Sequence, residues 1–280
     1  MKGFFNSALV INLGQKSYRT TSIPDRVYEN YLGGKGLGAY LLMRREKGAI
    51  HPFSAENDFI LALGPASDTK IWGSSRYGVF TKSPLTGIFS ESYSGGKAAA
   101  PMSRTGYDAI IIEGISPSPI FLEISDENVL FREAGTFWGL DTYESEEAIR
   151  AKTGAQDAGV LVIGPAGENM VRFASVVNDR WRCAGRTGAG AILGSKNVKG
   201  LVFHGNRTRE TADPDGIEAF ARFWREKGKT YPATAGYRRS GTAGLVAVIN
   251  SVNAFPTRYW AEGTVEGWED ISSDALHSRF

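Results

Sequence analysis

One motif occurs twice in the chain, and this repeat is the feature that most restricts the possible folds. The segment 58–66, DFILALGPA, is similar to the segment 159–166, GVLVIGPA, and in both an apolar run ends in Gly-Pro-Ala. A Gly-rich stretch follows each copy, and a second apolar run then ends at Gly114 or at Gly205. We interpret the pattern as two copies of one strand–loop–Gly-rich turn–helix–strand unit. The alternative is chance similarity between two strands that each precede Gly-Pro.

The apolar runs have the composition of strands that are buried on both faces. Such strands are continuous runs of Val, Ile, Leu and Phe, without alternating polar residues. Runs of this kind are the segments 8–12, 58–63, 108–113, 160–163 and 200–204. Two further runs, 120–124 and 129–132, flank the four polar residues 125–128 and predict a β-hairpin.

Helix signals are few in the first three quarters of the chain and more frequent after them. We predict helices over Tyr40–Glu46 and Ser145–Lys152, the second because acids occupy its first turn and bases its last. Apolar residues at helical spacing predict an amphipathic helix over Asp215–Lys227. We therefore expect an α+β domain with duplicated halves over residues 1–208. Residues 209–280 would be the beginning of a helical domain that is incomplete here.

Composition excludes several classes of protein. The chain has 32 Lys and Arg residues against 30 Asp and Glu, so no global charge attracts it to nucleic acid or to an anionic membrane. It lacks an apolar run of the length that spans a bilayer, and its first residues lack a signal-peptide pattern, so we expect a cytoplasmic protein. Cys183 is the only cysteine, which excludes an internal disulfide and a cysteine-ligated zinc or iron–sulfur site built from this chain alone.

The segment 31–40, YLGGKGLGAY, surrounds Lys35 with four glycines and precedes a predicted helix. Its backbone N–H groups would suit a phosphate at the start of that helix. The glycines would equally well allow the helix to pack closely against its neighbours. The segment is neither a dinucleotide-binding fingerprint nor a P-loop, because no strand leads directly into it and the residues after Lys35 are wrong.

The segment 72–96 combines Arg76 and Lys82 with many Ser, Thr and Gly residues. This composition, with little apolar periodicity, favours a surface that faces a ligand over a solvated loop. The guanidinium of Arg76 has the geometry to bind a phosphate or the edge of a pterin-type heterocycle.

The segment 178–199 places Arg180, Arg182 and Arg186 around a Gly-rich stretch. Three arginines and exposed backbone amides predict a site for an anion with several oxygens. Cys183 lies in the middle of this segment, and no histidine is near it in the sequence to activate a thiol. We therefore interpret Cys183 as a small buried apolar residue, not as a nucleophile.

Nine longer motifs, in one order, resemble the N-terminal part of the aldehyde:ferredoxin oxidoreductase family of tungsten- or molybdenum-pterin enzymes. The motifs are LGGKGLGAYLL, FSAENDFILALGPASDT, SSRYGVFTKSPLTG, SYSGG, GYDAIIIEG, VLVIGPAGENMVRFASVVND, AGRTGAGAILGSKNVKGL, GTAGLVAVIN and NAFPTRYW. The resemblance covers essentially the whole chain. It implies that residues 1–208 form two β-sheets in pseudo-twofold repeat, and that a metal–bis-pyranopterin cofactor lies on them.

The resemblance also implies which residues bind that cofactor. The corresponding positions are Arg76, Tyr93, Ser94, Gly95, Gly96, Arg182, Cys183, Ala184 and Gly185. A magnesium ion between the two pterin phosphates is implied, bound by the backbone carbonyl of Cys183 and by an asparagine side chain. Tyr93 stands in place of that asparagine, which leaves Arg76 and Arg182 as the natural partners of the phosphates. No catalytic residue is assigned.

The resemblance implies an activity for the complete enzyme. It would oxidise aldehydes to carboxylic acids and pass electrons through a [4Fe–4S] cluster to ferredoxin. The family's cluster cysteines lie in helical domains that this sequence lacks, so a complementary chain or domain would supply them. The alternative is a truncated or non-catalytic module that binds pterin or a partner. A third hypothesis, an unrelated nucleotide-binding enzyme, rests on the segment 31–40 alone.

Overall fold

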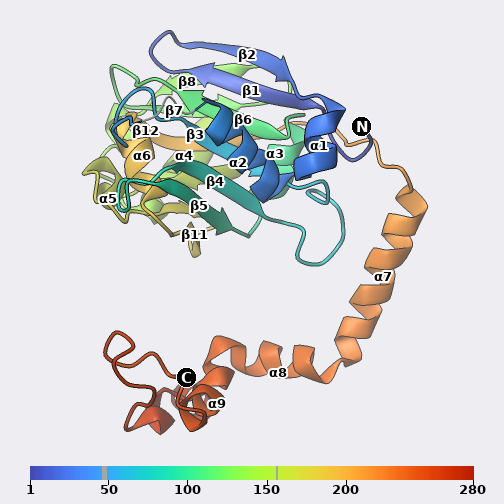
Figure 1. The fold of residues 1–280 in the computed structure, drawn as a ribbon, viewed down its shortest axis with the longest axis vertical. Coiled ribbons are helices and arrows are strands. Elements are labelled where there is room, and N and C mark those ends of the chain that lie inside the picture. Colours follow the sequence, from blue (N-terminus) through green and yellow to red (C-terminus); the bar gives the residue numbers. More distant parts are fainter. Residues whose placement is uncertain (46–48, 156) are drawn as a thin grey trace. The chain divides into compact units, whose positions relative to one another are not determined.

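The computed structural model describes residues 1–45, 49–155 and 157–280. The chain divides into two compact units, Met1–Ile217 and Glu218–Phe280. In the first unit, the strands form two six-stranded sheets (Figure 1). In the described ranges, no helix is both long enough and apolar enough to cross a lipid bilayer.

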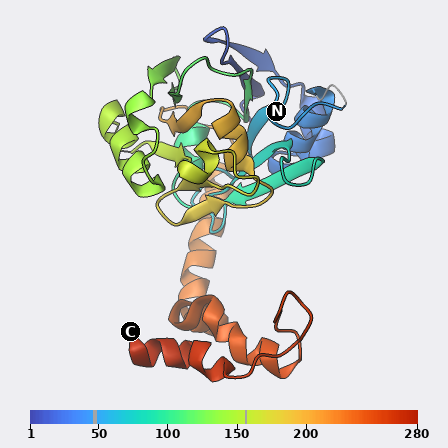
Figure 2. The same cartoon turned by 90° about the vertical axis from the view of Figure 1, so that its left-hand side faces the viewer.

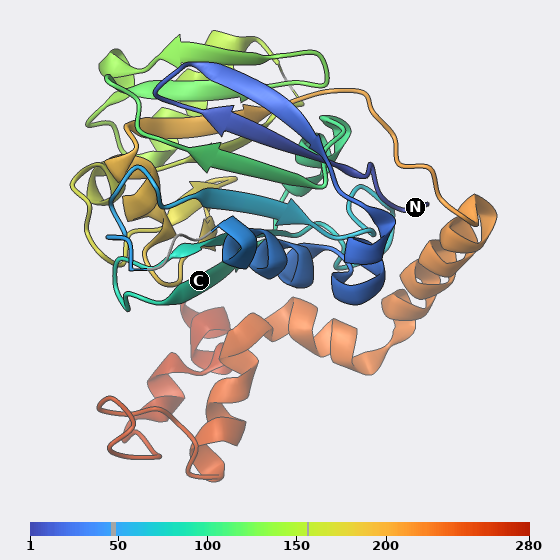
Figure 3. The same ribbon diagram turned by 45° about the horizontal axis from the view of Figure 1, so that its top comes forward.

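The first sheet has the strand order β2-β1-β6-β3-β4-β5, which can be followed in Figure 3. Within it, β1 and β6 run parallel, and every other neighbouring pair is antiparallel. Its strands are β1 (Ser7–Asn12), β2 (Ser17–Ser22), β3 (Phe59–Leu63), β4 (Tyr77–Lys82), β5 (Phe89–Ser94) and β6 (Ala109–Glu113).

The second sheet repeats this topology strand for strand, with the order β8-β7-β12-β9-β10-β11. Here β7 and β12 run parallel, and the other pairs are antiparallel. The strands are β7 (Ile120–Ile124), β8 (Val129–Glu133), β9 (Gly159–Val162), β10 (Val176–Asn178), β11 (Arg182–Ala184) and β12 (Val198–Phe203). The predicted duplication is confirmed, because the two similar runs are the equivalent strands β3 and β9. The predicted hairpin is β7–β8.

Helices cover the outer faces of the two sheets, which makes the first unit a four-layer α–β–β–α structure. The helices on the outer faces are α1 (Asp25–Tyr31) and α2 (Gly34–Arg45) on the first sheet and α4 (Thr142–Thr153) on the second. Helices α3 (Ala99–Arg104) and α6 (Ala189–Ser195) instead contribute apolar side chains to the core between the sheets. The short helix α5 (Pro165–Glu168) and the 3-10 turn η1 (Gly135–Phe137) complete the unit. Figure 2 shows α1 and α2 in blue on one side of this unit and α4 in yellow-green on the opposite side. This architecture confirms the expected α+β class.

The main hydrophobic core lies between the two sheets. Phe59 and Leu61 of β3 belong to it, whereas Ile60 points to the other face and packs with α1 and α2. In the second sheet, Leu161 of β9 belongs to the same core, whereas Val160 packs on the outer face with α4. Successive side chains of a strand point to opposite faces, so a strand between two apolar layers is apolar throughout. This explains the continuous apolar runs.

Helix α4 begins earlier than its charge pattern predicts because Asp141 caps it. The carboxylate of Asp141 accepts a hydrogen bond from the N–H group of Glu144 over 2.9 Å, and Glu144 bonds back to the N–H group of Asp141. This capping box satisfies backbone donors that have no partner within the helix. The helix ends before Gly154, which has φ +67° and adopts the left-handed conformation that glycine tolerates.

Helix α2 begins at Gly34, so most of the segment 31–40 is helical and is not the loop that the sequence indicates. The helix extends through Arg45 and thus contains the predicted helix Tyr40–Glu46 up to Arg45. Its predicted last residue, Glu46, lies outside the described residues. Gly34, Gly36 and Gly38 therefore lie in the first turns of a helix.

The second unit is helical. Helix α7 (Pro214–Thr230) confirms the predicted amphipathic helix and leads into this unit. Three of its aromatic side chains, on Phe220, Phe223 and Trp224, are about half exposed. The other elements are α8 (Pro232–Ser240), η2 (Gly241–Leu245), α9 (Val246–Ser251), η3 (Trp268–Ile271) and α10 (Ser273–Arg279).

Candidate functional site

The edge strand β5 of the first sheet meets β11 of the second, and serines of β5 line this seam. The hydroxyl of Ser94 donates to Oδ1 of Asn178 over 2.9 Å. The hydroxyl of Ser92 accepts from the N–H group of Arg186 over 3.0 Å. Both serines are buried, so their hydroxyls join the two halves. The expectation that the hydroxyl groups of the segment 72–96 face a ligand is wrong for these residues.

The turn Gly95–Gly96 follows β5 and lies between two arginines. A methyl group built on Gly95 would lie 3.8 Å from Nε of Arg76, which belongs to the first half. A methyl group built on Gly96, where φ is +90°, would lie 3.0 Å from Cγ of Arg182, which belongs to the second half. The structure therefore brings these predicted residues together at one turn, although they lie far apart in the sequence.

Neither of these two arginines has an ion-pair partner within the described part of the chain. Both side chains are exposed. Two guanidinium groups without a countercharge, one from each half, suit an anion that carries several oxygens.

A cavity of about 1160 Å³ opens beside the turn Gly95–Gly96. Among its basic side chains, those of Arg104, Arg150 and Arg180 are paired with carboxylates. Lys97 and Arg182 have no such partner among the residues described. The cavity is lined by Gly96, Lys97, Ala100, Pro101, Arg104, Glu146, Arg150, Asp157, Ala158, Asp179, Arg180, Trp181 and Arg182.

The expectation that Arg180, Arg182 and Arg186 form one anion site is wrong for Arg180. Its guanidinium forms an ion pair with Glu147 and lies 5.9 Å from the ring centroid of Tyr143. A cation whose charge is already compensated attracts a further anion weakly. The sequence pattern could not show this, because the carboxylate comes from helix α4.

Tyr93 points away from the seam. Successive residues of a strand face opposite sides, and the ring of Tyr93 packs edge-on against Phe80 on the face opposite Ser94. Its hydroxyl donates to Oε2 of Glu91 over 3.0 Å. Burial, together with this hydrogen bond to a carboxylate, raises the pKa of the Tyr93 hydroxyl, which therefore stays protonated.

The other predicted positions lie on β11 and just after it. Cys183 is exposed, so the expectation that it is buried is wrong: it lies on the edge strand β11 and pairs with Val177 of β10. Ala184 is buried. Gly185 is exposed and follows the strand. These residues continue the edge from which Arg182 projects, so they form one run beside the turn Gly95–Gly96.

The glycines of the segment 31–40 serve close packing. A methyl group on Gly36 would collide with the carbonyl oxygen of Tyr31, and one on Gly38 would collide with the ring of Phe80. Lys35 forms an ion pair with Glu91 over 2.8 Å. Of the two interpretations left open by the sequence, the packing interpretation is confirmed, and the hypothesis of an unrelated nucleotide-binding enzyme loses its only support.

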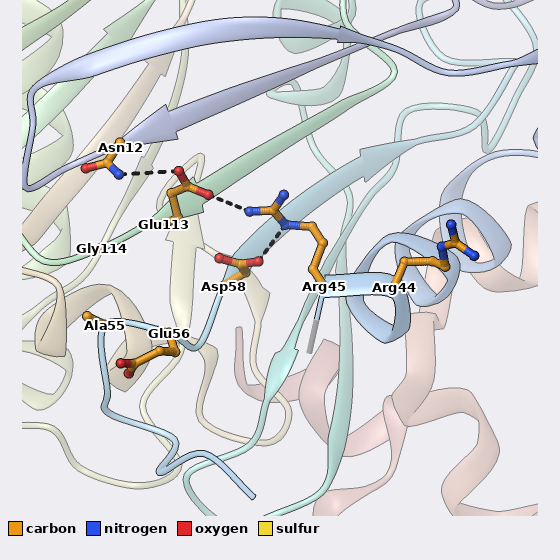
Figure 4. A pocket seen from close by; sticks show the side chains of 8 residues that line it. All are labelled: Asn12, Arg44, Arg45, Ala55, Glu56, Asp58, Glu113 and Gly114. Atoms are coloured by element: carbon orange, nitrogen blue, oxygen red, sulfur yellow. Dashed lines mark hydrogen bonds and ion pairs between the residues drawn. The ribbon is translucent and has the colours of Figure 1, made fainter. Parts of the chain in front are cut away.

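A second polar cavity, of about 590 Å³, contains none of the predicted site residues (Figure 4). Arg45 lies there between Asp58 and Glu113 and pairs with both, over 2.6 and 2.5 Å. Burial would raise the pKa of Glu113, but the hydrogen bond and charge of Arg45 outweigh it and lower that pKa. The charges of this cavity therefore largely compensate one another, unlike those at the turn Gly95–Gly96.

Within residues 1–45, 49–155 and 157–280, no group of three or more His, Cys, Asp and Glu side chains is arranged to hold a metal ion. The described part of the chain thus offers charge and backbone polar groups to a ligand, without a cluster of metal-binding side chains.

Two family models match the sequence. Residues 8–205 match "Aldehyde ferredoxin oxidoreductase, N-terminal domain", and residues 219–280 match "Aldehyde ferredoxin oxidoreductase, domains 2 & 3". Together the two matches cover nearly all of the chain.

Similar curated proteins include two tungsten-containing aldehyde ferredoxin oxidoreductases. That of Pyrococcus abyssi is 39% identical and that of Pyrococcus furiosus 35% identical over 281 residues, covering 100% of this chain and 46% of each relative. The "Aliphatic sulfonate oxidoreductase, WOR-like subunit" of Pyrococcus furiosus is 29% identical, covering 94% of this chain and 44% of that protein. The chain therefore spans about half the length of the curated relatives it matches.

A solved structure also resembles the chain. It is described as the active site complex of benzoyl coenzyme A reductase with 1,5-dienoyl-CoA. The similarity has a TM-score of 0.78 and 33% identity, and covers 81% of this chain and 35% of that chain. The two-sheet α+β fold is therefore shared with a solved protein.

Proposed function

The chain belongs to the aldehyde ferredoxin oxidoreductase family, and from this premise we propose that its first unit binds a tungsten- or molybdenum-bis-pyranopterin cofactor. The chain would be the N-terminal, cofactor-binding portion of an oxidoreductase. Tungsten is the metal named for the aldehyde-oxidising relatives. The complete protein would oxidise an aldehyde to a carboxylic acid.

One observation carries this proposal: Arg76 and Arg182, without ion-pair partners among the described residues, flank the turn Gly95–Gly96. A bis-pterin carries two phosphates, and its negative charge requires compensation at the surface that holds it. A guanidinium can donate two parallel hydrogen bonds to one phosphate. The nearby backbone of the segment 93–96 and of the segment 182–185 would add polar contacts, and Ser94 would contribute through its backbone.

The metal chemistry would come from the cofactor. When bound, the tungsten or molybdenum bis-pyranopterin supplies oxygen transfer and takes up two electrons. The chain's own residues would seat the cofactor and neutralise its phosphates.

The proposal includes a magnesium ion at the phosphates, but with only one of the two protein ligands that the family resemblance implies. The backbone carbonyl of Cys183 would be a ligand. The hydroxyl of Tyr93 faces Glu91 and is not available as the side-chain ligand. Arg76 and Arg182 would therefore provide a larger share of the charge compensation.

The electron path would lie outside this chain. A [4Fe–4S] cluster needs several cysteine ligands, and the sequence has only Cys183. A complementary chain or domain would supply these ligands, and ferredoxin would accept the electrons.

The test measures pterin and tungsten in the protein purified natively, together with its complementary domain or chain. Arg182→Ala removes a charge-assisted bond to phosphate and should weaken cofactor retention about ten-fold to hundred-fold. Arg26→Ala is the matched control, because Arg26 is an exposed arginine on α1 away from the proposed site.

The outcomes separate the hypotheses. Cofactor loss in Arg182→Ala and in Arg76→Ala, but not in Arg26→Ala, supports the proposed site. Unchanged pterin content in all three variants contradicts it. Aldehyde oxidation by the assembled, wild-type protein supports the enzyme, whereas pterin binding without turnover supports the non-catalytic module.

A further inference from the structure

Asn178 is a buried residue at the seam to which the sequence analysis assigns no role. Its side chain has no exposed surface. Oδ1 accepts hydrogen bonds from the hydroxyls of Tyr77 and Ser94, each over 2.9 Å. Nδ2 donates to the carbonyl of Gly95 over 3.0 Å and to Oδ2 of Asp179 over 2.8 Å. The amide therefore uses both of its donors and both acceptor positions of its oxygen.

The bonds of Asn178 cross from one half of the duplicated unit to the other. Tyr77, Ser94 and Gly95 belong to the first half, whereas Asn178 ends β10 in the second. The side chain thus joins two strands of one sheet to the hairpin of the other. Because all of its hydrogen-bonding positions are occupied, the amide does not bind a ligand directly.

Asp179 completes the attachment of the turn Gly95–Gly96. Its Oδ2 accepts from the N–H group of Lys97 over 2.5 Å, while Asn178 holds the carbonyl of Gly95. The turn is therefore held on both sides of Gly96. A methyl group on Gly96 would collide with both side chains, so the hairpin and the turn are in close contact.

The hairpin held in this way is the one that presents Arg182. Its turn contains Asp179 with φ +48° and Arg180 with φ +62°. Asp tolerates a positive φ, but for Arg it is uncommon. Such a turn persists when its surroundings determine it. The bonds of Asn178 and Asp179 are the interactions that fix it against the first half.

We propose that Asn178, acting with Asp179, is a positioning residue that holds Arg182 and the turn Gly95–Gly96 in the arrangement required to bind the phosphates of the cofactor. This inference rests on the proposed function. A fully bonded buried amide specifies one geometry, because displacement of either half breaks several bonds at once. An apolar residue at the same place would pack without fixing the arrangement.

The test uses Asn178→Asp in the natively assembled protein. The change keeps the size of the side chain but places a carboxylate oxygen against the carbonyl of Gly95 and the carboxylate of Asp179. We expect pterin retention at pH 8 to fall at least ten-fold. Burial beside Asp179 raises the pKa of the introduced carboxyl, which regains a donor when protonated. Retention should therefore recover as the pH is lowered towards 5.5.

Asn57→Asp is the matched control. Asn57 is equally buried and also uses four hydrogen bonds, to Pro52, Thr81 and Lys82, away from the seam. We expect a comparable loss of thermal stability in this variant, without the pH-dependent loss of pterin. A general effect of destabilisation would make both variants lose the cofactor alike and would contradict the proposal.

A milder variant keeps the test decisive if Asn178→Asp does not fold. Ser94→Ala removes one donor to Asn178 and should lower pterin retention about three-fold while the fold persists. Full retention in Ser94→Ala, with loss in Arg182→Ala, overturns the positioning role alone, and full retention in a folded Asn178→Asp does the same. Full retention in Arg182→Ala as well overturns the proposed function.

Discussion

The two halves of the first unit share one topology but differ where they meet. In the first half, β4 and β5 each have six residues, whereas β10 and β11 in the second half each have three. The long hairpin contributes buried hydroxyls to the seam, and the short hairpin contributes Asn178 and Arg182. A duplicated framework has thus kept its strand order while its edges became complementary to one another.

The acidic residue after each Gly-Pro-Ala turn shows a second difference. Asp68 pairs with Arg104, whose side chain is 44% exposed. Glu168 pairs with Lys199, and both side chains are almost fully buried. Glu168 also accepts hydrogen bonds from the N–H group of Gly139. Equivalent positions therefore carry a surface ion pair in one half and a buried one in the other.

The largest expected effect concerns the ion pairs of these two equivalent acidic residues. Glu168→Gln leaves the buried ammonium of Lys199 without a countercharge and should lower the free energy of unfolding by about 3–5 kcal/mol. Asp68→Asn should lower it by less than about 1 kcal/mol, because solvent screens the half-exposed partner. Urea unfolding of the two variants measures both. Equal losses would show that the two positions are equivalent in energy as well as in sequence.

The next effect concerns Lys196, a buried cation of the second half whose ammonium donates to the carbonyl of Gly114 over 2.9 Å. Burial lowers its pKa from 10.5 to about 8, although Asp58 and Glu113 of the first half oppose this shift. Below pH 8 both folded and unfolded states bind this proton, and the cost of the buried charge is fully present. Between pH 8 and 10.5 the unfolded state alone keeps it, so stability should rise with pH.

Comparison with Lys196→Met isolates this contribution. From pH 7.5 to 9.5, the free energy of unfolding of the wild type should rise relative to that of the variant by about 1–3 kcal/mol. Denaturant titrations at several pH values measure the difference. Parallel curves for the two proteins would mean that Lys196 titrates alike in the folded and unfolded states.

The smallest expected effect concerns the helices that cover the outer faces. Helix α4 of the second half has the capping box of Asp141, whereas α1 of the first half begins after Pro24 without a side-chain cap. Asp141→Ala should therefore cost about 1 kcal/mol, measured as a shift of the unfolding midpoint. Asp25→Ala, in the first turn of α1, removes no such cap. A larger loss in Asp25→Ala would reverse this comparison.

Most of the inner strands could be predicted from the sequence, whereas the edge strands β2, β5 and β11 could not. Strands β3 and β9 are buried on both faces, so burial itself produces a continuous apolar run. Strand β2 is exposed along its whole length, and its hydrogen bonds to β1 hold it in place. Backbone bonds of this kind place almost no requirement on side chains, so the sequence SYRTTS lacks an apolar run, and its strand signal is limited to the β propensity of Tyr and Thr.

The candidate site was partly visible for a related reason. The importance of Arg76 and Arg182 followed from their composition and from the family resemblance, but their meeting at one turn depends on how two sheets pack. Asn178 was visible only as a polar residue at the end of an apolar run. Its partner Tyr77 lies on the other sheet, and local spacing contains no information on such a pairing.

In each half the first strand lies beside the last, as β1 beside β6 and β7 beside β12. The strand β6 lies between the pair β2–β1 and the three strands β3–β4–β5. During synthesis on the ribosome, these two fragments therefore cannot join into one sheet until β6 has left the exit tunnel. Until residue 113 has emerged, the nascent chain therefore exposes the unpaired edges of two incomplete sheet fragments. In the second half, the two fragments remain separate in the same way until β12, which ends at residue 203, has emerged.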